Sequence, residues 1–298
     1  MRKILNDEFI SKLETLSFHM NSFMRGYFGG NHRTSAYGST VEFADFREYT
    51  LGDDIRHIDW NLYSRFEKHF IKLFVDERQM FIQVYLDCSA SMEKADSKKS
   101  EFALKTAASI GYLAVHNMDR LSYRLIQGDS AFDLSGTIIG KDNFFRTISL
   151  LEETEFKGEA DLDKAITGQN DVGTNDGLTV IISDFLTDSN WKKAVDYLLY
   201  KKRQVMLIQV LAPDELKPLY TGRIRLVDSE SSSPIDDKNM KMKITKADIK
   251  AYNEALKDFK EDMKNFCMAR GVNFISISSD EKIEQLIFNK LAQVGTVT

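Results

Sequence analysis

The chain has 298 residues, enough for one large domain with an appendage or for two domains. Hydrophobic residues make up 43% and charged residues 29%, the usual balance of a soluble globular protein. The net charge of −5, without any dense basic run, argues against nucleic-acid binding. The two cysteines, Cys88 and Cys267, exclude a disulfide framework and indicate a reducing compartment. We therefore expect a cytoplasmic protein.

The first 30 residues carry apolar side chains at helical spacing, such as Leu5, Phe9 and Leu13, and predict one amphipathic helix. Charged residues interrupt this stretch, which argues against a secretory signal peptide. No run approaches the ~18 apolar residues of a membrane span, so we expect no membrane insertion. Residues 31–80 are rich in charges and aromatics and predict short strands and turns. We assign residues 1–80 to an N-terminal helical and irregular β region.

From residue 81, apolar strand-like segments alternate with segments of helical periodicity. The predicted strands are 81–87, 121–127, 177–184, 204–211 and 272–278, and 130–135 is expected to pair back on the second. The predicted helices are 100–118, 142–153, 190–202, 246–270 and 280–293. The alternation predicts an α/β fold, a doubly wound and mostly parallel sheet with helices on both faces. Residues 213–245 predict an inserted β-hairpin, and we assign 81–298 to one domain.

Two of the predicted strands end in aspartate, Asp87 and Asp184. The carboxyl ends of parallel strands line one crevice in a doubly wound sheet, so the two carboxylates are expected to meet. Ser89 and Ser91 follow the first aspartate at alternate positions, from which a turning loop can aim both hydroxyls at one ion. Such hard oxygens suit Mg²⁺ or Mn²⁺. Hydroxyls are neutral, so the ion would accept a further carboxylate from a partner, and the pattern predicts a docking point.

The pattern Asp-x-Ser-x-Ser after an apolar strand resembles the metal-ion-dependent adhesion site of von Willebrand factor A domains. The stretch 41–65 closely resembles the signature of a bacterial family known as DUF58. The matching residues are Glu42-Phe43, Arg47, Tyr49, Gly52-Asp53-Asp54, Arg56 through Trp60, and Ser64-Arg65. The resemblance continues through 183–186 and the C-terminal hairpin and helix, and so covers most of the chain. It implies a von Willebrand factor A-like fold of the Rossmann type.

The resemblance also implies three metal-site segments. The residues that match the first and third segments are Asp87, Ser89, Ser91 and Asp184. The second segment should be a Gly-Gly-Thr-Asp turn, and the matching stretch has Gly158 and Asp161 but Ala160 where the threonine ligand should stand. An alanine methyl cannot bind an ion. Water or Asp161 would fill that position, or metal binding has weakened or been lost.

Plainer readings of the same residues stay open. Ser89 and Ser91 would cap a following helix, although the predicted helix begins several residues later. The charged block from Gly52 to Trp60 is explained best as a structural ion-pair network with the tryptophan packed beneath it. Cys88 has no activating base fixed beside it and is expected to be a small buried filler.

The resemblance implies a non-enzymatic protein–protein interaction module. Its expected partners are a MoxR-type AAA+ ATPase and a client protein, in a chaperone-like assembly or maturation task. The chain has no Walker A motif, so ATP hydrolysis would come from the partner. One alternative is a metal-dependent phosphotransferase or hydrolase with Asp87 as nucleophile, although Ser89 stands where that class has a second acid. Another is a scaffold whose metal site has degenerated, as Ala160 permits.

Overall fold

The computed structural model describes residues 4–6, 8–15, 41–50, 53–76, 79–94, 97–169, 172, 177–218, 222–226 and 240–283. By its internal contacts the chain divides into two compact units. One unit is Asn31–Gln79, and the other comprises Met1–Gly30 with Met80–Thr298. In the second unit, the described part of the N-terminal segment is helical over residues 8–15. The single helix predicted for residues 1–30 was placed too early, because residues 4–6 are described and are not helical, and residues 16–30 lie outside the described residues.

The larger unit is built on a six-stranded sheet with the order β10-β7-β6-β3-β4-β5. The strands are β3 (Phe81–Asp87), β4 (Arg120–Gln127), β5 (Ser130–Asp133), β6 (Gly177–Ser183), β7 (Gln204–Leu211) and β10 (Asn273–Ser278). All neighbours run parallel except β5, which returns antiparallel to β4. The predicted α/β class and mostly parallel sheet are therefore confirmed. The central strands are buried on both faces, which is why their sequences are continuous apolar runs.

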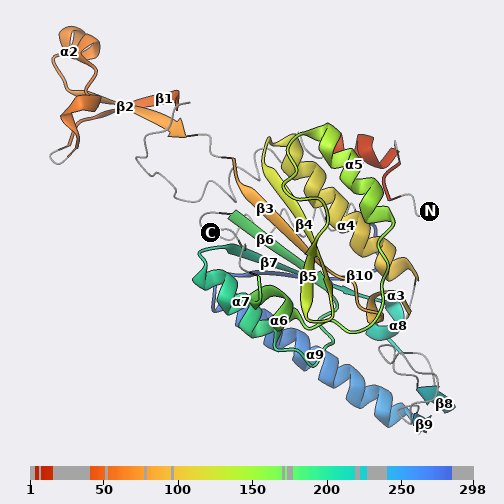
Figure 1. Ribbon diagram of the computed structural model, residues 1–298. Coiled ribbons are helices and arrows are strands. Elements are labelled where there is room, and N and C mark those ends of the chain that lie inside the picture. Colours follow the sequence, from red (N-terminus) through yellow and green to blue (C-terminus); the bar gives the residue numbers. More distant parts are fainter. Residues whose placement is uncertain are drawn as a thin grey trace. The chain divides into compact units, whose positions relative to one another are not determined.

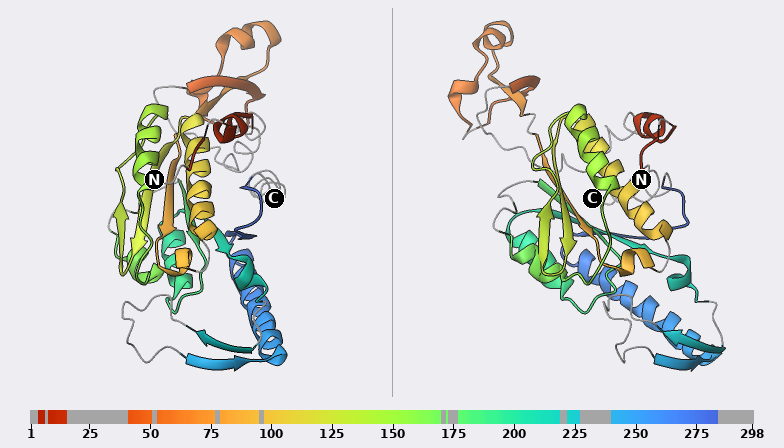
Figure 2. Two further views of the ribbon diagram at one scale, coloured as in Figure 1. Left: turned by 90° about the vertical axis from the view of Figure 1, so that its right-hand side faces the viewer. Right: turned by 45° about the vertical axis from the view of Figure 1, so that its right-hand side comes forward.

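Helices cover both faces of this sheet (Figures 1 and 2). One face carries α4 (Ser97–His116) and α5 (Lys141–Glu152), and the other carries α6 (Leu162–Thr167), α7 (Trp191–Tyr200) and α9 (Lys246–Met268). Alternate residues of β3 point to opposite cores, because side chains alternate along a strand. Val84 and Leu86 pack into the core beneath α4, whereas Tyr85 packs into the core beneath α7. Two hydrophobic cores thus hold the sheet rigid between two helical layers.

The close approach of α4 to β4 requires a glycine. A Cβ atom at Gly111 would lie 1.9 Å from Tyr123 Oη and 2.8 Å from Leu121 Cδ2. The Tyr123 hydroxyl occupies the space above the glycine and donates a hydrogen bond to the Ala107 carbonyl oxygen, at 3.1 Å. This contact fixes α4 in position over the sheet.

A short hairpin interrupts the alternation after β7, as predicted. Helix α8 (Pro213–Leu216) follows β7, and β8 (Gly222–Leu226) pairs antiparallel with β9 (Met240–Ile244). Helix α9 then begins at a capping box in which Thr245 and Asp248 satisfy each other's backbone N–H groups. The helix predicted over 280–293 falls largely outside the described residues. Across the part of the chain that the structure describes, no helix combines the length and apolar character needed to cross a membrane.

The unit Asn31–Gln79 is an antiparallel pair of strands with two helical turns between them. The elements are β1 (Val41–Glu48), the 3-10 turn η1 (Ile55–His57), α2 (Trp60–Phe66) and β2 (Phe70–Asp76). The short strands and turns predicted here are present. Helix α2 was not predicted, and it has no buried residue that would have given an apolar stripe.

The charged block of this unit contains two of the predicted ion pairs, but the tryptophan lies elsewhere than predicted. Arg47 pairs with Asp53 at 2.6 Å, and Arg56 pairs with Asp54 at 2.7 Å. Trp60 is 62% exposed rather than packed beneath the ion pairs, so that part of the prediction is wrong. The physical reason is local: Asp59 caps α2 by accepting from the backbone N–H groups that follow it, and this starts a helix whose first residue points outward.

Candidate functional site

The predicted site residues lie at the carboxyl edge of the sheet, where β3 and β6 end. Ser91 donates a hydrogen bond from Oγ to Asp184 Oδ2 at 2.9 Å, and the hydroxyls of Ser89 and Ser91 lie 3.0 Å apart. Residues 93 positions apart in the sequence are therefore joined directly. We call Asp87, Ser89, Ser91 and Asp184 the strand-tip site.

Asp87 is buried at the end of β3 and both of its carboxylate oxygens accept hydrogen bonds. The backbone N–H of Ser89 donates to Oδ1 at 2.9 Å, and the Ser183 hydroxyl donates to Oδ2 at 2.6 Å. Burial, and then the charge of Asp184, raise the pKa of Asp87 to about 6, against the lowering effect of these bonds. The two hydrogen bonds hold the Asp87 carboxylate in a single orientation.

The loop after β3 is fixed by the segment that precedes α6. Ala90 N–H donates to the Gly158 carbonyl oxygen, and Lys157 N–H donates to the Cys88 carbonyl oxygen, both at 2.8 Å. The backbone of Ala160 bridges to Gly128 after β4. The stretch that resembles the second metal segment therefore lies beside the strand-tip loop.

Asp161 is engaged elsewhere. Its Oδ1 accepts from the backbone N–H of Lys164 at 3.1 Å as the N-cap of α6, and its Oδ2 lies 3.1 Å from the Lys164 ammonium. Burial acts to raise the pKa of Asp161, but the bonds and charge of Lys164 outweigh it, and the pKa is lowered. The side chain is ionised and committed to a helix cap.

The structure adds a residue that the sequence did not single out, Lys99 in the first turn of α4. Its side chain is completely buried, with 0% exposure. The ammonium donates to Asp184 Oδ2 at 2.8 Å, to Glu215 Oε1 at 2.7 Å and to the Ser91 carbonyl oxygen at 3.2 Å. Burial disfavours the charged form, but Asp184 and Glu215 outweigh it, and the pKa of Lys99 is raised. A permanent cation therefore lies in the strand-tip site.

Glu215 comes from α8 and holds the ammonium from the second side. Its Oε2 accepts from the backbone N–H of Ala212 at 2.7 Å, which fixes the carboxylate at the start of that helix. Burial is the largest influence and raises the pKa of Glu215. The sequence carried one signal for Lys99: it precedes Phe102 and Ala103 by three and four positions, so it lies on the buried stripe of α4.

We asked whether these side chains fit a divalent cation. Asp87, Ser89, Ser91 and Asp184 supply hard oxygens of the kind that Mg²⁺ and Mn²⁺ prefer. Two features oppose such an ion: a methyl group stands at Ala160, and the Lys99 ammonium already binds Asp184 Oδ2. The described residues also contain no cluster of three or more His, Cys, Asp or Glu side chains suited to a metal. As arranged here, the site fits its resident ammonium rather than a divalent ion.

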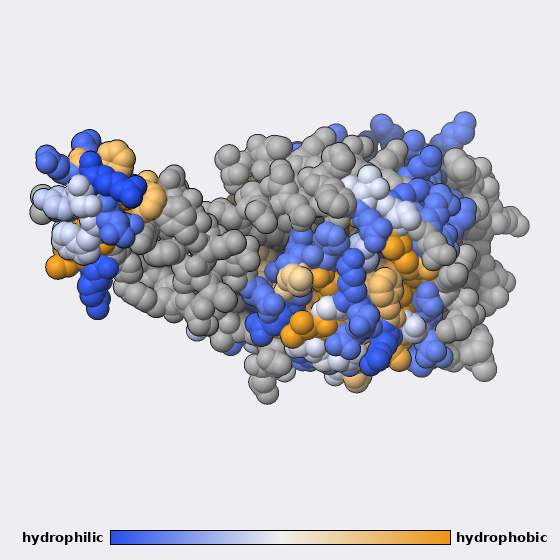
Figure 3. All heavy atoms as spheres, turned by 90° about the horizontal axis from the view of Figure 1, so that it is seen from above, coloured by the Kyte–Doolittle hydropathy of each residue, from blue (hydrophilic) through white to orange (hydrophobic). Residues whose placement is uncertain are grey.

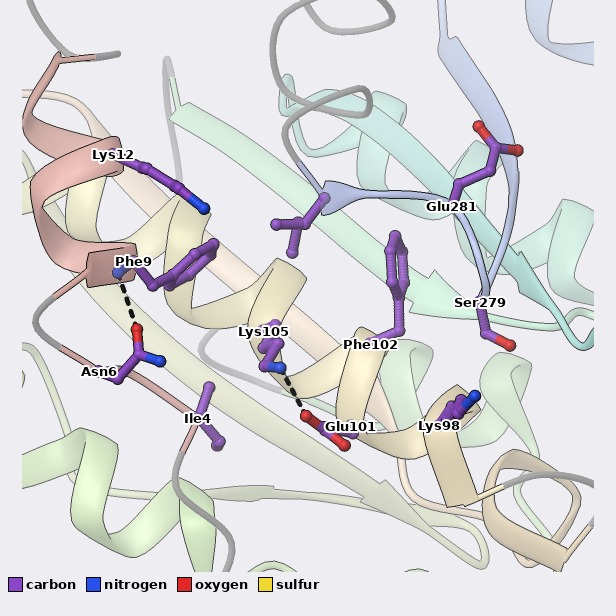
Figure 4. A pocket seen from close by; sticks show the side chains of 11 residues that line it. Ile4, Asn6, Phe9, Lys12, Lys98, Glu101, Phe102, Lys105, Ser279 and Glu281 are labelled. Carbon is purple, nitrogen blue, oxygen red and sulfur yellow. Dashed lines mark hydrogen bonds and ion pairs between the residues drawn. The ribbon is translucent and has the colours of Figure 1, made fainter.

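A pocket of about 390 Å³ lies on the other side of the first turns of α4 (Figure 4). Its walls come from the N-terminal segment, from α4 and from the end of β10. The labelled side chains include Phe9 and Lys12 on one wall and Phe102 with the Lys105–Glu101 ion pair on another. The lining also includes Lys98, Ser279 and Glu281, and none of the predicted site residues belongs to it.

Comparisons with known proteins identify a family and a fold. The family described as "Protein of unknown function DUF58" matches residues 45–258. An uncharacterized protein of Mycobacterium tuberculosis is 28% identical over 224 residues, which is 74% of this chain and 70% of the relative. An uncharacterized protein of Mycobacterium bovis matches with the same values.

Solved structures of von Willebrand factor A domains also match. A von Willebrand factor type A protein from Catenulispora acidiphila has 9% identity and a TM-score of 0.36, covering 60% of this chain and 43% of that chain. Proximal thread matrix protein 1 from the mussel byssus, with a zinc-occupied metal-ion-dependent adhesion motif, has 8% identity and a TM-score of 0.40, covering 73% and 46%. This chain spans less than half of either, and both likenesses concern the fold alone.

Proposed function

Because this chain belongs to the DUF58 family, we propose that it is a non-enzymatic protein–protein interaction module whose contact point is the strand-tip site. Its partner in this proposal is a MoxR-type AAA+ ATPase, and the pair acts on a client protein in assembly or maturation. The observation that carries the proposal is the joining of Asp87, Ser89, Ser91 and Asp184 at one edge of a rigid sheet.

The state of the nucleophile candidates supports a binding role. Asp87 is 2% exposed and both of its oxygens are hydrogen-bonded, so it is poorly placed to attack a substrate. Cys88 is fully buried, and burial, with the nearby Asp87 charge, raises the pKa of its thiol well above the usual value. The Ser91 hydroxyl donates to Asp184 Oδ2, an oxygen that also accepts from the Lys99 ammonium, and the Ser89 hydroxyl lies 3.0 Å from that of Ser91.

In this proposal, a divalent metal ion could bind the strand-tip site only after the side chains there had rearranged. Asp87, Ser89, Ser91 and Asp184 are its candidate ligands, and Asp161 would join them only by leaving Lys164. Mg²⁺ or Mn²⁺ held there would offer an open coordination position to a partner carboxylate. The Ala160 methyl and the Lys99 ammonium favour a second candidate, a scaffold with a degenerate metal site.

A binding measurement with the purified ATPase of the same organism tests the proposal. We expect Asp184→Asn to weaken binding at least about tenfold, because it alters the centre of the site. The matched control is Asp262→Asn, which removes an exposed carboxylate on α9 and should leave the affinity unchanged. Equal binding by wild type and Asp184→Asn would favour the scaffold. Turnover of phosphate or ester substrates that Asp87→Asn abolishes would favour the enzyme.

A further inference from the structure

We infer that Lys99 is a built-in cation that competes with divalent metal ions for the strand-tip site. The inference rests on the proposed function only for the location of the site. It holds that the ammonium takes the charge-balancing place of a metal, so that metal binding and the Lys99–Asp184 contact exclude each other.

The geometry of the contacts indicates that a divalent ion would replace the Lys99 ammonium and would not bind beside it. Asp184 Oδ2 accepts from both the Ser91 hydroxyl and the Lys99 ammonium, at 2.9 and 2.8 Å. An ion bound by Asp184 and Ser91 would need that same oxygen and would face the ammonium at close range. Like charges a few ångström apart in a buried site repel strongly, because water screens them poorly. A divalent ion therefore enters only when Lys99 moves away.

Leaving is costly for Lys99, because every ammonium hydrogen has a partner. The acceptors are Asp184, Glu215 and the backbone of Ser91, and the side chain has 0% exposure. Glu215 is itself fixed by the Ala212 backbone N–H, so the second acid cannot follow the lysine outward. The contacts make the wild-type site a weak metal binder.

The charge balance predicts what removal of the lysine does. Asp87, Asp184 and Glu215 surround the site, and Lys99 is the cation that contacts two of them. Lys99→Met keeps an unbranched side chain of similar length and removes the charge. The acids are then left without their counter-ion, which both lowers the stability of the fold and raises the attraction for an added cation.

Calorimetric titration of MnCl₂ and MgCl₂ into the isolated protein tests the inference. We expect Lys99→Met to bind Mn²⁺ at least about 100-fold more tightly than wild type, because a like charge has been removed from a buried site. The variant should melt below wild type without metal, and added Mn²⁺ should raise its Tm far more than that of wild type. Lys99→Gln, which keeps a donor toward Asp184, serves if the methionine variant does not fold.

Two further variants sharpen the test. Lys105→Met removes a half-exposed lysine from the same helix and should leave metal binding unchanged. Lys99→Met with Asp184→Asn should lose the affinity that Lys99→Met gained, because the shared oxygen is altered. Equal Mn²⁺ affinity in wild type and Lys99→Met would overturn the inference, as would affinity that survives in the double variant.

These measurements use the protein without a partner, so they are separate from the proposed function. A gain of metal affinity together with no ATPase binding would remove the proposed partner and keep the role of Lys99. If Asp184→Asn weakened ATPase binding but Lys99→Met bound Mn²⁺ no more tightly than wild type, the proposed partner would stand and the role of Lys99 would be removed.

Discussion

One buried ammonium determines how the acids at the strand tips behave. In a site of carboxylates and hydroxyls alone, the negative charge of the carboxylates would favour binding of a metal ion. Lys99 supplies that charge from within the chain, through 2.7 and 2.8 Å contacts to Glu215 and Asp184. The methyl group of Ala160 fits the same account, because a site balanced by lysine does not need the threonine ligand that the family pattern supplies.

A half-buried carboxylate, Asp119, gives a pH-dependent prediction at the residue scale. It lies before β4, and its Oδ1 accepts from the backbone N–H of Met80 at 2.8 Å. Burial raises its pKa from 3.8 to about 6. The folded state thus holds this proton more tightly than the unfolded chain, so the wild type loses stability as the pH rises from about 4 to about 6.

We expect Asp119→Asn to raise the free energy of unfolding by about 1 kcal/mol at pH 7.5, since asparagine keeps the acceptor and avoids the buried charge. The gain should be absent at pH 4, where the wild-type acid is protonated. Thermal melts between pH 4 and 8 check this, with exposed Asp258→Asn as the control. A lower Tm for Asp119→Asn at pH 7.5 would mean that the charged form is needed.

At the scale of elements, the packing of α4 on β4 decides where Lys99 points. Gly111 allows the helix to approach Tyr123, and the same helix delivers Lys99 to the site from its first turn. Any change that lifts α4 from the sheet also moves the ammonium relative to Asp184. Helix packing and site electrostatics are thus coupled through one rigid element.

We expect Gly111→Ala to destabilise the protein by about 1–3 kcal/mol, because overpacking outweighs the ~1 kcal/mol that alanine gains in a helix. The new Cβ would meet the Tyr123 hydroxyl at 1.9 Å. Denaturant melts of Gly111→Ala, Tyr123→Phe and the double variant form the check. Removing the hydroxyl should relieve the shortest contact but leave those with Leu121 Cδ2 and Tyr123 Cζ, at 2.8 and 2.9 Å, so the double variant should be somewhat more stable than the sum of the two losses predicts. If the stability losses of the two single variants simply added, the strain caused by Gly111→Ala would not come from the Tyr123 hydroxyl.

The elements of the sheet unit follow from local patterns, whereas the site depends on distant contacts. β3 and β7 have the predicted bounds because continuous apolar runs mark buried parallel strands. α4 begins at Ser97, three residues before its predicted start, where no apolar residue marks the first turn. The Lys99–Glu215 pair spans 116 positions, so no local pattern reveals it. Asp87, Asp184 and the two serines were predictable because they directly follow apolar strands.

At the scale of the whole molecule, the unit Asn31–Gln79 exposes several large apolar side chains. Ile55, Trp60 and Phe66 are each 62% exposed. Figure 3 shows hydrophobic and hydrophilic side chains mixed on the surface of this unit. Exposed aromatic side chains such as Trp60 are enriched among the residues that anchor interfaces. Trp60 also belongs to the family signature, which makes this surface a candidate for the ATPase contact.

We expect Trp60→Ser with Phe66→Ser to leave the stability of the fold within about 1 kcal/mol, since exposed side chains contribute little to folding. The same variant should weaken ATPase binding at least about tenfold, because aromatic anchors dominate interfaces. Tyr200→Ser is the matched control, a tyrosine 81% exposed on α7 of the other unit. Thermal melts and binding isotherms measure both effects. Unchanged binding by the double variant would restrict the contact to the strand tips, and equal weakening by Tyr200→Ser would show that surface aromatics act without specificity.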